Sequence, residues 1–108
     1  MPGTATTLTS LSIPAAGKYV AWAKAFFTAS GLSASGTVSC DLVGGSDTDL
    51  SQTFVATGTT FTLTNTVVHE FTAAGTFDYK CAYSGTGTTT ANFIKITVIK
   101  VNNLTNTG

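Results

Sequence analysis

Residues 59–71 read TTFTLTNTVVHEF. Phe61, Leu63, Val67 and Phe71 recur at every second or fourth position, between threonines and other polar residues. A period of two places alternate side chains on opposite faces of an extended strand. Threonine makes up about a fifth of the chain, and this β-branched residue favours strands while wetting their outer faces. The stretch therefore predicts a β-strand with one apolar face.

The rest of the chain repeats this pattern outward from residues 59–71. Glycine, serine and aspartate separate short apolar stretches, and no segment keeps a helical period. We expect an all-β fold, an antiparallel two-sheet sandwich of about seven to eight strands with jelly-roll or immunoglobulin-like topology. The further strands are expected at residues 7–13, 18–28, 37–43, 50–55 (short, at an edge), 77–83 and 89–101.

The length and charge of the chain narrow the range of partners. A chain of 108 residues suits one domain, so we expect a single unit over 1–108 with short flexible ends at about 1–5 and 103–108.

Only 9% of the residues are charged, and the formal net charge is zero. This balance argues against nucleic-acid and membrane partners, whereas a near-neutral surface favours self-association. The first residues resemble no signal peptide, so we expect synthesis in a host cytoplasm.

Two of the expected strands carry large apolar side chains on both faces. In residues 18–28, Tyr19 and Phe27 share one face with alanines, while Trp22 and Phe26 share the other with lysines. A solvent-facing sheet surface does not normally carry such side chains. We therefore expect the second face to bury itself against an identical subunit. The interface candidates are Trp22, Phe26, Phe93, Ile99 and Val101.

The two cysteines, Cys40 and Cys81, both fall in expected strands. They are candidates for one disulfide or for a buried thiol pair. A disulfide would close a loop of about forty residues and add about 4 kcal/mol in the chain-entropy model.

Residue types needed for catalysis are scarce. His69 is the only histidine, Glu70 the only glutamate and Met1 the only methionine, and the chain has no Gly-x-Ser-x-Gly motif. Zinc and copper sites need several nitrogen or sulfur ligands, and a glycosidase needs a pair of carboxylates. We expect no enzyme activity, no cofactor and no metal site, and we interpret His69 as a partly exposed polar residue of a strand or a subunit contact.

Three segments resemble a group of known modules. They are the opening IPAAGKYV (residues 13–20), the turn CDLVGG (residues 40–45) and ANFIKITV (residues 91–98). Together they are similar to small β-sandwich modules in structural proteins (decoration or fibre) of actinobacterial phages and at the ends of bacterial collagen-like fibres. They are more loosely similar to the jelly-roll heads of the tumour-necrosis-factor and complement superfamily. Those heads are typically homotrimers, which implies a trimer.

These observations lead to one main hypothesis and one competing class. The main hypothesis is a bacteriophage virion structural protein, most specifically a capsid decoration (cement) protein or else a tail-fibre head. Its expected partner is the major capsid protein or another virion component. A host-surface glycan is a further candidate partner. The competing class is a stand-alone carbohydrate-binding or immunoglobulin-like adhesion module, a secreted fragment in which Trp22, Tyr19 and Tyr83 form an exposed aromatic platform.

Overall fold

The structure is a computed structural model that describes residues 3–103, apart from the side chains of residues 32–34. All pairings between its strands are antiparallel, and the described residues contain no helix, so the predicted all-β class is confirmed. Within this range no helix of a length and apolarity suited to crossing a membrane occurs. The strands are β1 (Thr6–Ile13), β2 (Gly17–Gly44), β3 (Asp47–Ala56), β4 (Thr60–Phe71) and β5 (Gly75–Val101).

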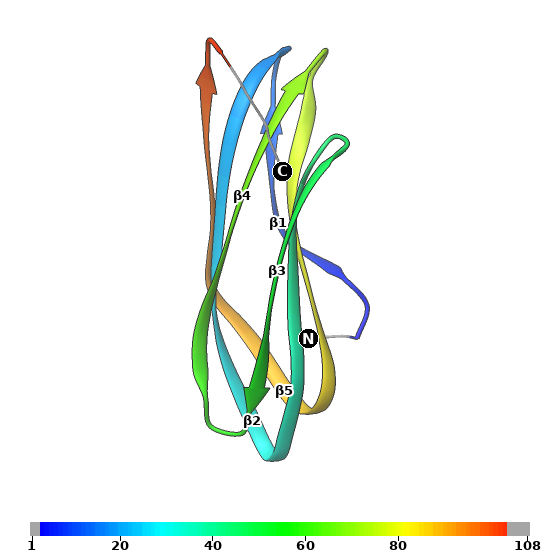
Figure 1. Ribbon diagram of the computed structural model, residues 1–108, viewed down its shortest axis with the longest axis vertical. Coiled ribbons are helices and arrows are strands. Elements are labelled where there is room, and N and C mark those ends of the chain that lie inside the picture. The colour runs from blue at the N-terminus through cyan, green and yellow to red at the C-terminus, as the bar shows by residue number, and fades with distance from the viewer. Residues whose placement is uncertain (1–2, 104–108) are drawn as a thin grey trace.

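The fold is built around one long ribbon made of β2 and β5. The two strands pair from Lys18, opposite Val101, to Gly44, opposite Phe77. The pairing register shifts between Ser30 and Ser35, and there both strands turn back on themselves at the foot of the molecule (Figure 1). The ribbon is therefore folded in half, and the molecule measures 49 × 24 × 20 Å.

Folding the ribbon creates two groups of neighbouring strands. The three-strand segment consists of residues 17–30 of β2, with β4 on one side and residues 88–101 of β5 on the other. The four-strand segment has the order β1, residues 75–86 of β5, residues 35–44 of β2, and β3. The predicted edge position of residues 50–55 is confirmed, because β3 ends this row.

The predicted number of strands is too high. Residues 3–103 form five strands in one hydrogen-bonded network, so seven to eight strands in two separate sheets are not confirmed. The reason is local: residues 31–36 and 85–87, which lie between the expected strands, bend the chain without ending the strand, so that the stretches on either side belong to β2 and β5. Glycine and serine can break a strand, but they can also let one bend without ending.

Two glycines allow the ribbon to bend. Gly36 and Gly85 lie directly opposite each other in the β2–β5 pairing. A Cβ atom on Gly36 would overlap the backbone of Ser84, and one on Gly85 would overlap the backbone of Ser35. The two strands can approach this closely only because neither residue has a side chain.

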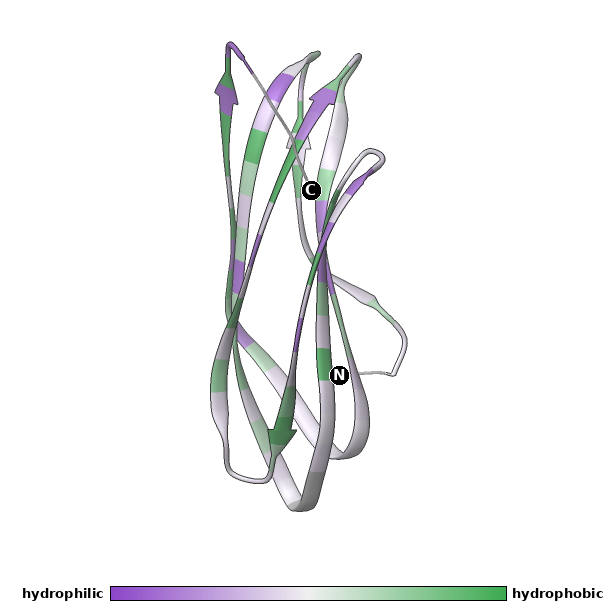
Figure 2. Ribbon diagram, viewed as in Figure 1, coloured by the Kyte–Doolittle hydropathy of each residue, from purple (hydrophilic) through white to green (hydrophobic). Residues whose placement is uncertain are grey.

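The core lies between the inner faces of the two segments, and hydrophobic and hydrophilic residues alternate along the strands that surround it (Figure 2). Every second residue of β2 from Tyr19 to Ala29 is buried, as is every second residue from Val38 to Leu42. The largest fully buried side chains are Tyr79, Phe27, Phe77, Leu42, Val38, Cys40 and Cys81.

Flexible ends were expected at about residues 1–5 and 103–108. Of these, residues 1–2 and 104–108 lie outside the described residues.

Candidate functional site

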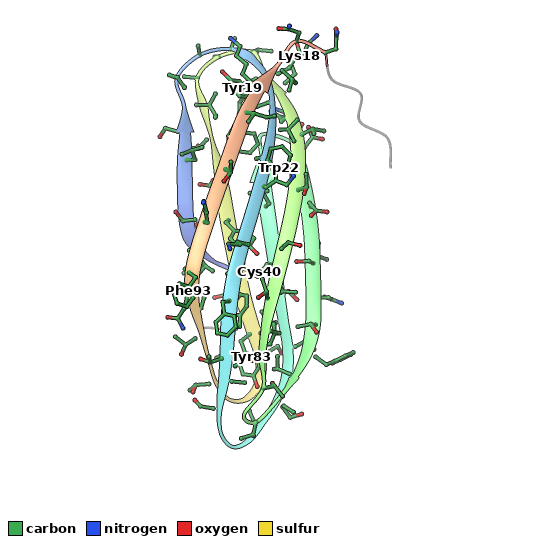
Figure 3. The ribbon with its side chains drawn as sticks, turned by 90° about the vertical axis from the view of Figure 1, so that its left-hand side faces the viewer. Lys18, Tyr19, Trp22, Cys40, Tyr83 and Phe93 are labelled. Carbon is green, nitrogen blue, oxygen red and sulfur yellow. A yellow bond between two sulfur atoms is a disulfide. The ribbon has the colours of Figure 1, made fainter. Side chains whose placement is uncertain are left out.

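The outer face of the three-strand segment carries all five predicted interface residues. Trp22 is 41% exposed, Phe93 79% and Ile99 47%, while Phe26 and Val101 are half-buried. They belong to β2 and to the strand directly paired with it, and Trp22 and Phe93 are marked in Figure 3. On the other face of the same β5 residues, Ile94, Ile96 and Val98 pack against the core. The role of the outer residues as an interface stays a prediction.

Phe93 is held outward by an irregular backbone. Between the pairs Lys24–Lys95 and Phe26–Asn92 the register shifts, leaving two residues of β5 opposite one of β2, which is the arrangement of a β-bulge. Phe93 has a φ angle of 53° there, which costs a bulky residue on the order of 1–3 kcal/mol. Its ring meets that of Phe26 edge-on, with 6.1 Å between centroids. Such strain is a feature of functional sites.

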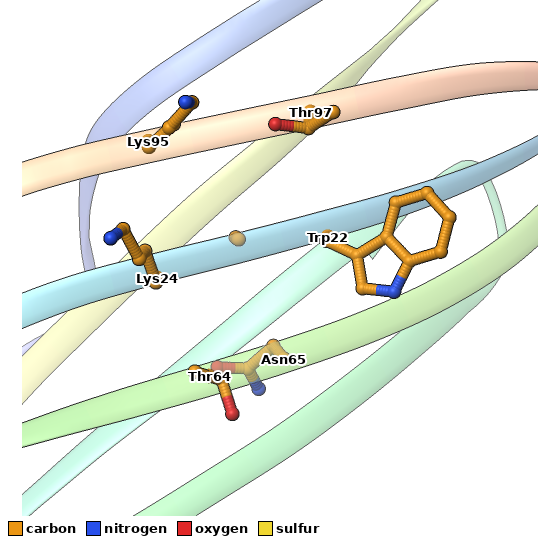
Figure 4. A pocket seen from close by; sticks show the side chains of 7 residues that line it. Trp22, Lys24, Thr64, Asn65, Lys95 and Thr97 are labelled. Atoms are coloured by element: carbon orange, nitrogen blue, oxygen red, sulfur yellow. The ribbon is translucent and has the colours of Figure 1, made fainter.

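Two lysines lie at the centre of the same face. Lys24 on β2 is directly opposite Lys95 on β5, and Figure 4 shows them on neighbouring strands beside Trp22. A shallow hollow of about 260 Å³ lies here, and an adjoining hollow of about 240 Å³ continues toward Phe26 and Phe93. The lining of the first hollow comprises Trp22, Ala23, Lys24, Thr64, Asn65, Lys95 and Thr97.

Behind this face, Asn65 ties the two segments together. Its side-chain nitrogen donates hydrogen bonds to the carbonyl oxygens of Cys40 (3.2 Å) and Asp49 (2.9 Å). Its side-chain oxygen accepts hydrogen bonds from the hydroxyls of Ser51 (2.9 Å) and Tyr79 (3.1 Å). The amide is only 2% exposed, and all four of its hydrogen-bonding positions are used. This network joins β4 to β2, β3 and β5.

The environment of Tyr79 changes its acidity. Burial, and secondarily the negative charge of Asp49, raises the pKa of the Tyr79 hydroxyl from 10.0 to about 12. The neutral hydroxyl donates to Asn65, so the ionised form would lose this hydrogen bond. The group is structural, because it lies in the core and not on the outer face.

His69 lies at the seam between β3 and β4. Its Nδ1 atom is 2.6 Å from Oδ2 of Asp47, and its ring contacts that of Phe71 edge-on at 4.5 Å. Gly45, with a φ angle of 57°, sits against the ring, which a Cβ atom there would overlap. His69 is thus partly exposed, as predicted. Sequence reasoning missed its partner Asp47, which lies 22 positions earlier and meets it only because β3 and β4 lie side by side.

The cysteine pair forms a buried disulfide. Cys40 and Cys81 are directly opposite on β2 and β5, are joined by a disulfide with 4.1 Å between their Cα atoms, and are fully buried. The bond therefore crosses neighbouring strands of the four-strand segment. In an immunoglobulin domain the corresponding bond joins two sheets.

The aromatic platform expected for a glycan-binding module is only partly present. Tyr19 and Tyr83 are 7% and 4% exposed, so they cannot offer a ring face to a ligand. Both belong to the inward-facing set: Tyr19 meets Phe71 in the core, and the Tyr83 hydroxyl donates to the carbonyl oxygen of Thr86. Of the three candidates only Trp22 remains exposed.

A second exposed apolar pair was not anticipated. Leu50 is 58% exposed and Phe54 88%, both on the outer face of β3, where Leu50 is opposite Asp41. The sequence did contain this signal, since Leu50 and Phe54 are four positions apart and so lie on the same face of a strand.

Within residues 3–103, His, Cys, Asp and Glu side chains nowhere gather in a group of three suited to a metal ion.

Comparison with known proteins gave no match: no protein-family model or curated protein matches the sequence, and no solved structure matches the fold.

Proposed function

We propose that this chain is a structural protein of a bacteriophage virion, in its most specific form a capsid decoration protein, and that it works by docking its sheet faces and not by catalysis. One observation carries the proposal. Trp22, Phe93 and Ile99 are exposed on the outer face of the three-strand segment, although the inner face of the same strands already closes the core. Apolar side chains grouped in this way on a folded protein mark a surface made for a partner.

The proposal includes a finer description of the architecture. We infer that the two segments act as the two layers of a sandwich in which the folded β2–β5 ribbon gives a jelly-roll-like topology. Support comes from the division of pairings, since β4 pairs with the first half of β2 and β3 with its second half. Further support is the common core between the inner faces.

Two properties of the chain favour a virion over a cellular setting. Few side chains are charged, which leaves a threonine-rich surface that packs readily against neighbours. The buried disulfide suits a protein that works outside a reducing cytosol, as a released particle does. The partners we propose are identical copies, with a trimer favoured, and the major capsid protein.

The direct test is the composition of the particle. Virions purified from a lysate of a host that carries the gene should contain this chain in many copies, detected by mass spectrometry and placed on the capsid surface by electron cryomicroscopy. A Phe93→Ser variant should be lost from the particles, whereas Thr90→Ser, on the same strand, should be retained. Virions free of the wild-type chain would refute the proposal.

One observation favours a second candidate, a stand-alone glycan-binding module. The hollow beside Trp22 is lined by lysine and threonine side chains, and an aromatic ring next to hydrogen-bond donors suits a sugar. On a glycan array this candidate predicts binding that Trp22→Ala abolishes. The control Phe54→Ala, at an exposed ring on the opposite segment, should leave such binding unchanged. An array without signal would remove this candidate.

A further inference from the structure

The neutral chain separates its charges between the two segments. The three-strand segment carries four lysines (Lys18, Lys24, Lys95, Lys100) and one acid, Glu70, a formal charge of +3. The four-strand segment carries four aspartates (Asp41, Asp47, Asp49, Asp78) and one lysine, Lys80, a formal charge of −3. Not all of these groups lie on the outer faces, because Asp47 and Asp49 face β4 and Lys100 is opposite the buried Tyr19. The outward-facing positions keep the difference in sign: Lys18, Lys24, Lys95 and Glu70 give the three-strand segment a positive outer face, and Asp41, Asp78 and Lys80 give the four-strand segment a weakly negative one.

The positive face contains an unfavourable pair. Lys24 and Lys95 lie directly opposite each other, an arrangement of like charges that destabilises an antiparallel sheet. In the part of the chain that the structure describes, no carboxylate forms an ion pair with either lysine; the recorded ion pair joins His69 and Asp47. Glu70 is opposite Lys18 at the far end of the segment. The centre of this face therefore lacks an anionic partner.

The two faces have matching apolar spacing. On β2, Trp22 and Phe26 are four residues apart and flank Lys24. On β3, Leu50 and Phe54 are also four residues apart, and Asp41 lies opposite Leu50. Four strand residues span about 13 Å, so each face offers two large apolar side chains at the same separation. The charge beside them is positive on β2 (Lys24) and negative beside β3 (Asp41).

The acidic side is not uniformly free. Asp49 accepts a hydrogen bond from the backbone nitrogen of Thr66, and Asp47 pairs with His69. Asp78 accepts one from Ser10, and Lys80 is paired in register with Asp41. Although Lys80 lies opposite Asp41, no ion pair joins the two among the described residues. Asp41, beside the exposed Leu50, is the carboxylate best placed to meet a lysine from outside.

We propose that the outer face of the three-strand segment of one copy docks on the outer face of the four-strand segment of a second copy. This inference rests on the proposed assembly function and names the partner. A two-fold contact between three-strand faces would bring the lysine pairs of both copies together, and like charges across an interface are costly. The contact is therefore heterologous, and its repetition gives a ring or a chain of copies.

The test is a charge exchange followed by sedimentation velocity at low and high salt. The wild type should self-associate, and more weakly at high salt because exposed charges are screened. Lys24→Glu/Lys95→Glu and Asp41→Lys should each weaken association by about tenfold or more. Mixing these two variants should restore association, because the altered three-strand face then meets the altered four-strand face. Lys100→Gln, at the end of β5, serves as the matched control and should associate like the wild type.

Several results would overturn this inference. They are a wild type that sediments as a monomer at millimolar concentration, variants that show no rescue on mixing, or a lysine variant that loses glycan binding but not self-association. Thermal unfolding of each variant checks that it is folded. The virion experiment stays separate: self-association without incorporation into particles would refute the virion proposal alone, and incorporation without self-association would refute this inference alone.

Discussion

The two halves of β2 differ in what they carry on their outer faces. Residues 17–30 direct Tyr19, Phe27 and four alanines inward, and direct Trp22 and Phe26 outward. Residues 35–44 direct Val38, Cys40 and Leu42 inward, and their outward side chains are small or polar apart from Val43. The alanines leave room for large side chains from the four-strand segment, such as Tyr79 and Phe77. Both halves of β2 thus fill the core, but only the first half also carries aromatic side chains on its outer face.

This contrast predicts that stability depends on the buried interior and little on the outer face of the three-strand segment. Replacing both cysteines (Cys40→Ala/Cys81→Ala) should lower the free energy of unfolding by about 4 kcal/mol, because the unfolded chain regains the entropy of a loop of about forty residues. Urea unfolding measures the loss. The comparison variant, Trp22→Thr on the three-strand face, should cost less than about 1 kcal/mol. Equal losses from the two changes would contradict the contrast.

The hydrogen bonds between the segments can be tested at Asn65. Asn65→Ala should destabilise the protein by on the order of 3 kcal/mol, because buried carbonyl and hydroxyl groups on several strands lose their partner together. The same urea titration measures the effect. Thr64→Ala, one position away but facing outward, should change stability by less than about 0.5 kcal/mol. A small loss at Asn65 would mean that water replaces the amide.

The raised pKa of Tyr79, about 12, predicts a loss of stability in alkali. In the unfolded chain the hydroxyl ionises near its ordinary pKa of 10.0. Below pH 10 the hydroxyl is neutral in both the folded and the unfolded state, so its contribution to the free energy of unfolding is fully present. This contribution, on the order of 2–3 kcal/mol, is lost as the pH rises from 10 to 12. Tyr79→Phe should lack this part of the alkaline decline. Urea midpoints for both proteins between pH 9 and 12 measure it, and parallel curves would refute the assignment.

The smallest effect on stability is expected at Phe93. Phe93→Gly relieves the strain of a positive φ angle, on the order of 1–3 kcal/mol, but loses the ring contact with Phe26 and makes the unfolded chain more flexible. The net change should be below about 1 kcal/mol by thermal unfolding, while self-association falls. Phe77→Gly, fully buried in the other segment, should cost more than about 3 kcal/mol. A strongly destabilised Phe93 variant would show that this ring serves the core.

Much of this fold and site followed from local pattern. The period of two at residues 59–71 predicted β4, and the same period placed Trp22 and Phe26 together on one face of their strand. Partners distant in sequence could not be predicted in this way. Asp47 near His69, Asn65 between four strands, and the pairing of Lys24 with Lys95 depend on how strands lie in space. Strand count failed for a related reason, since flexible residues such as Gly36 and Gly85 can bend a strand as well as end it.

The sequence by itself determined the β class, the two faces of each strand and the scarcity of catalytic residue types. These are local properties, because alternation and composition act over a few neighbouring residues. Only the tertiary structure decided which strands are neighbours, that Tyr19 and Tyr83 are buried while Trp22 is exposed, and that a neutral chain has a positive and a negative side. Those outcomes depend on the folding of the β2–β5 ribbon, which brings residues dozens of positions apart into contact.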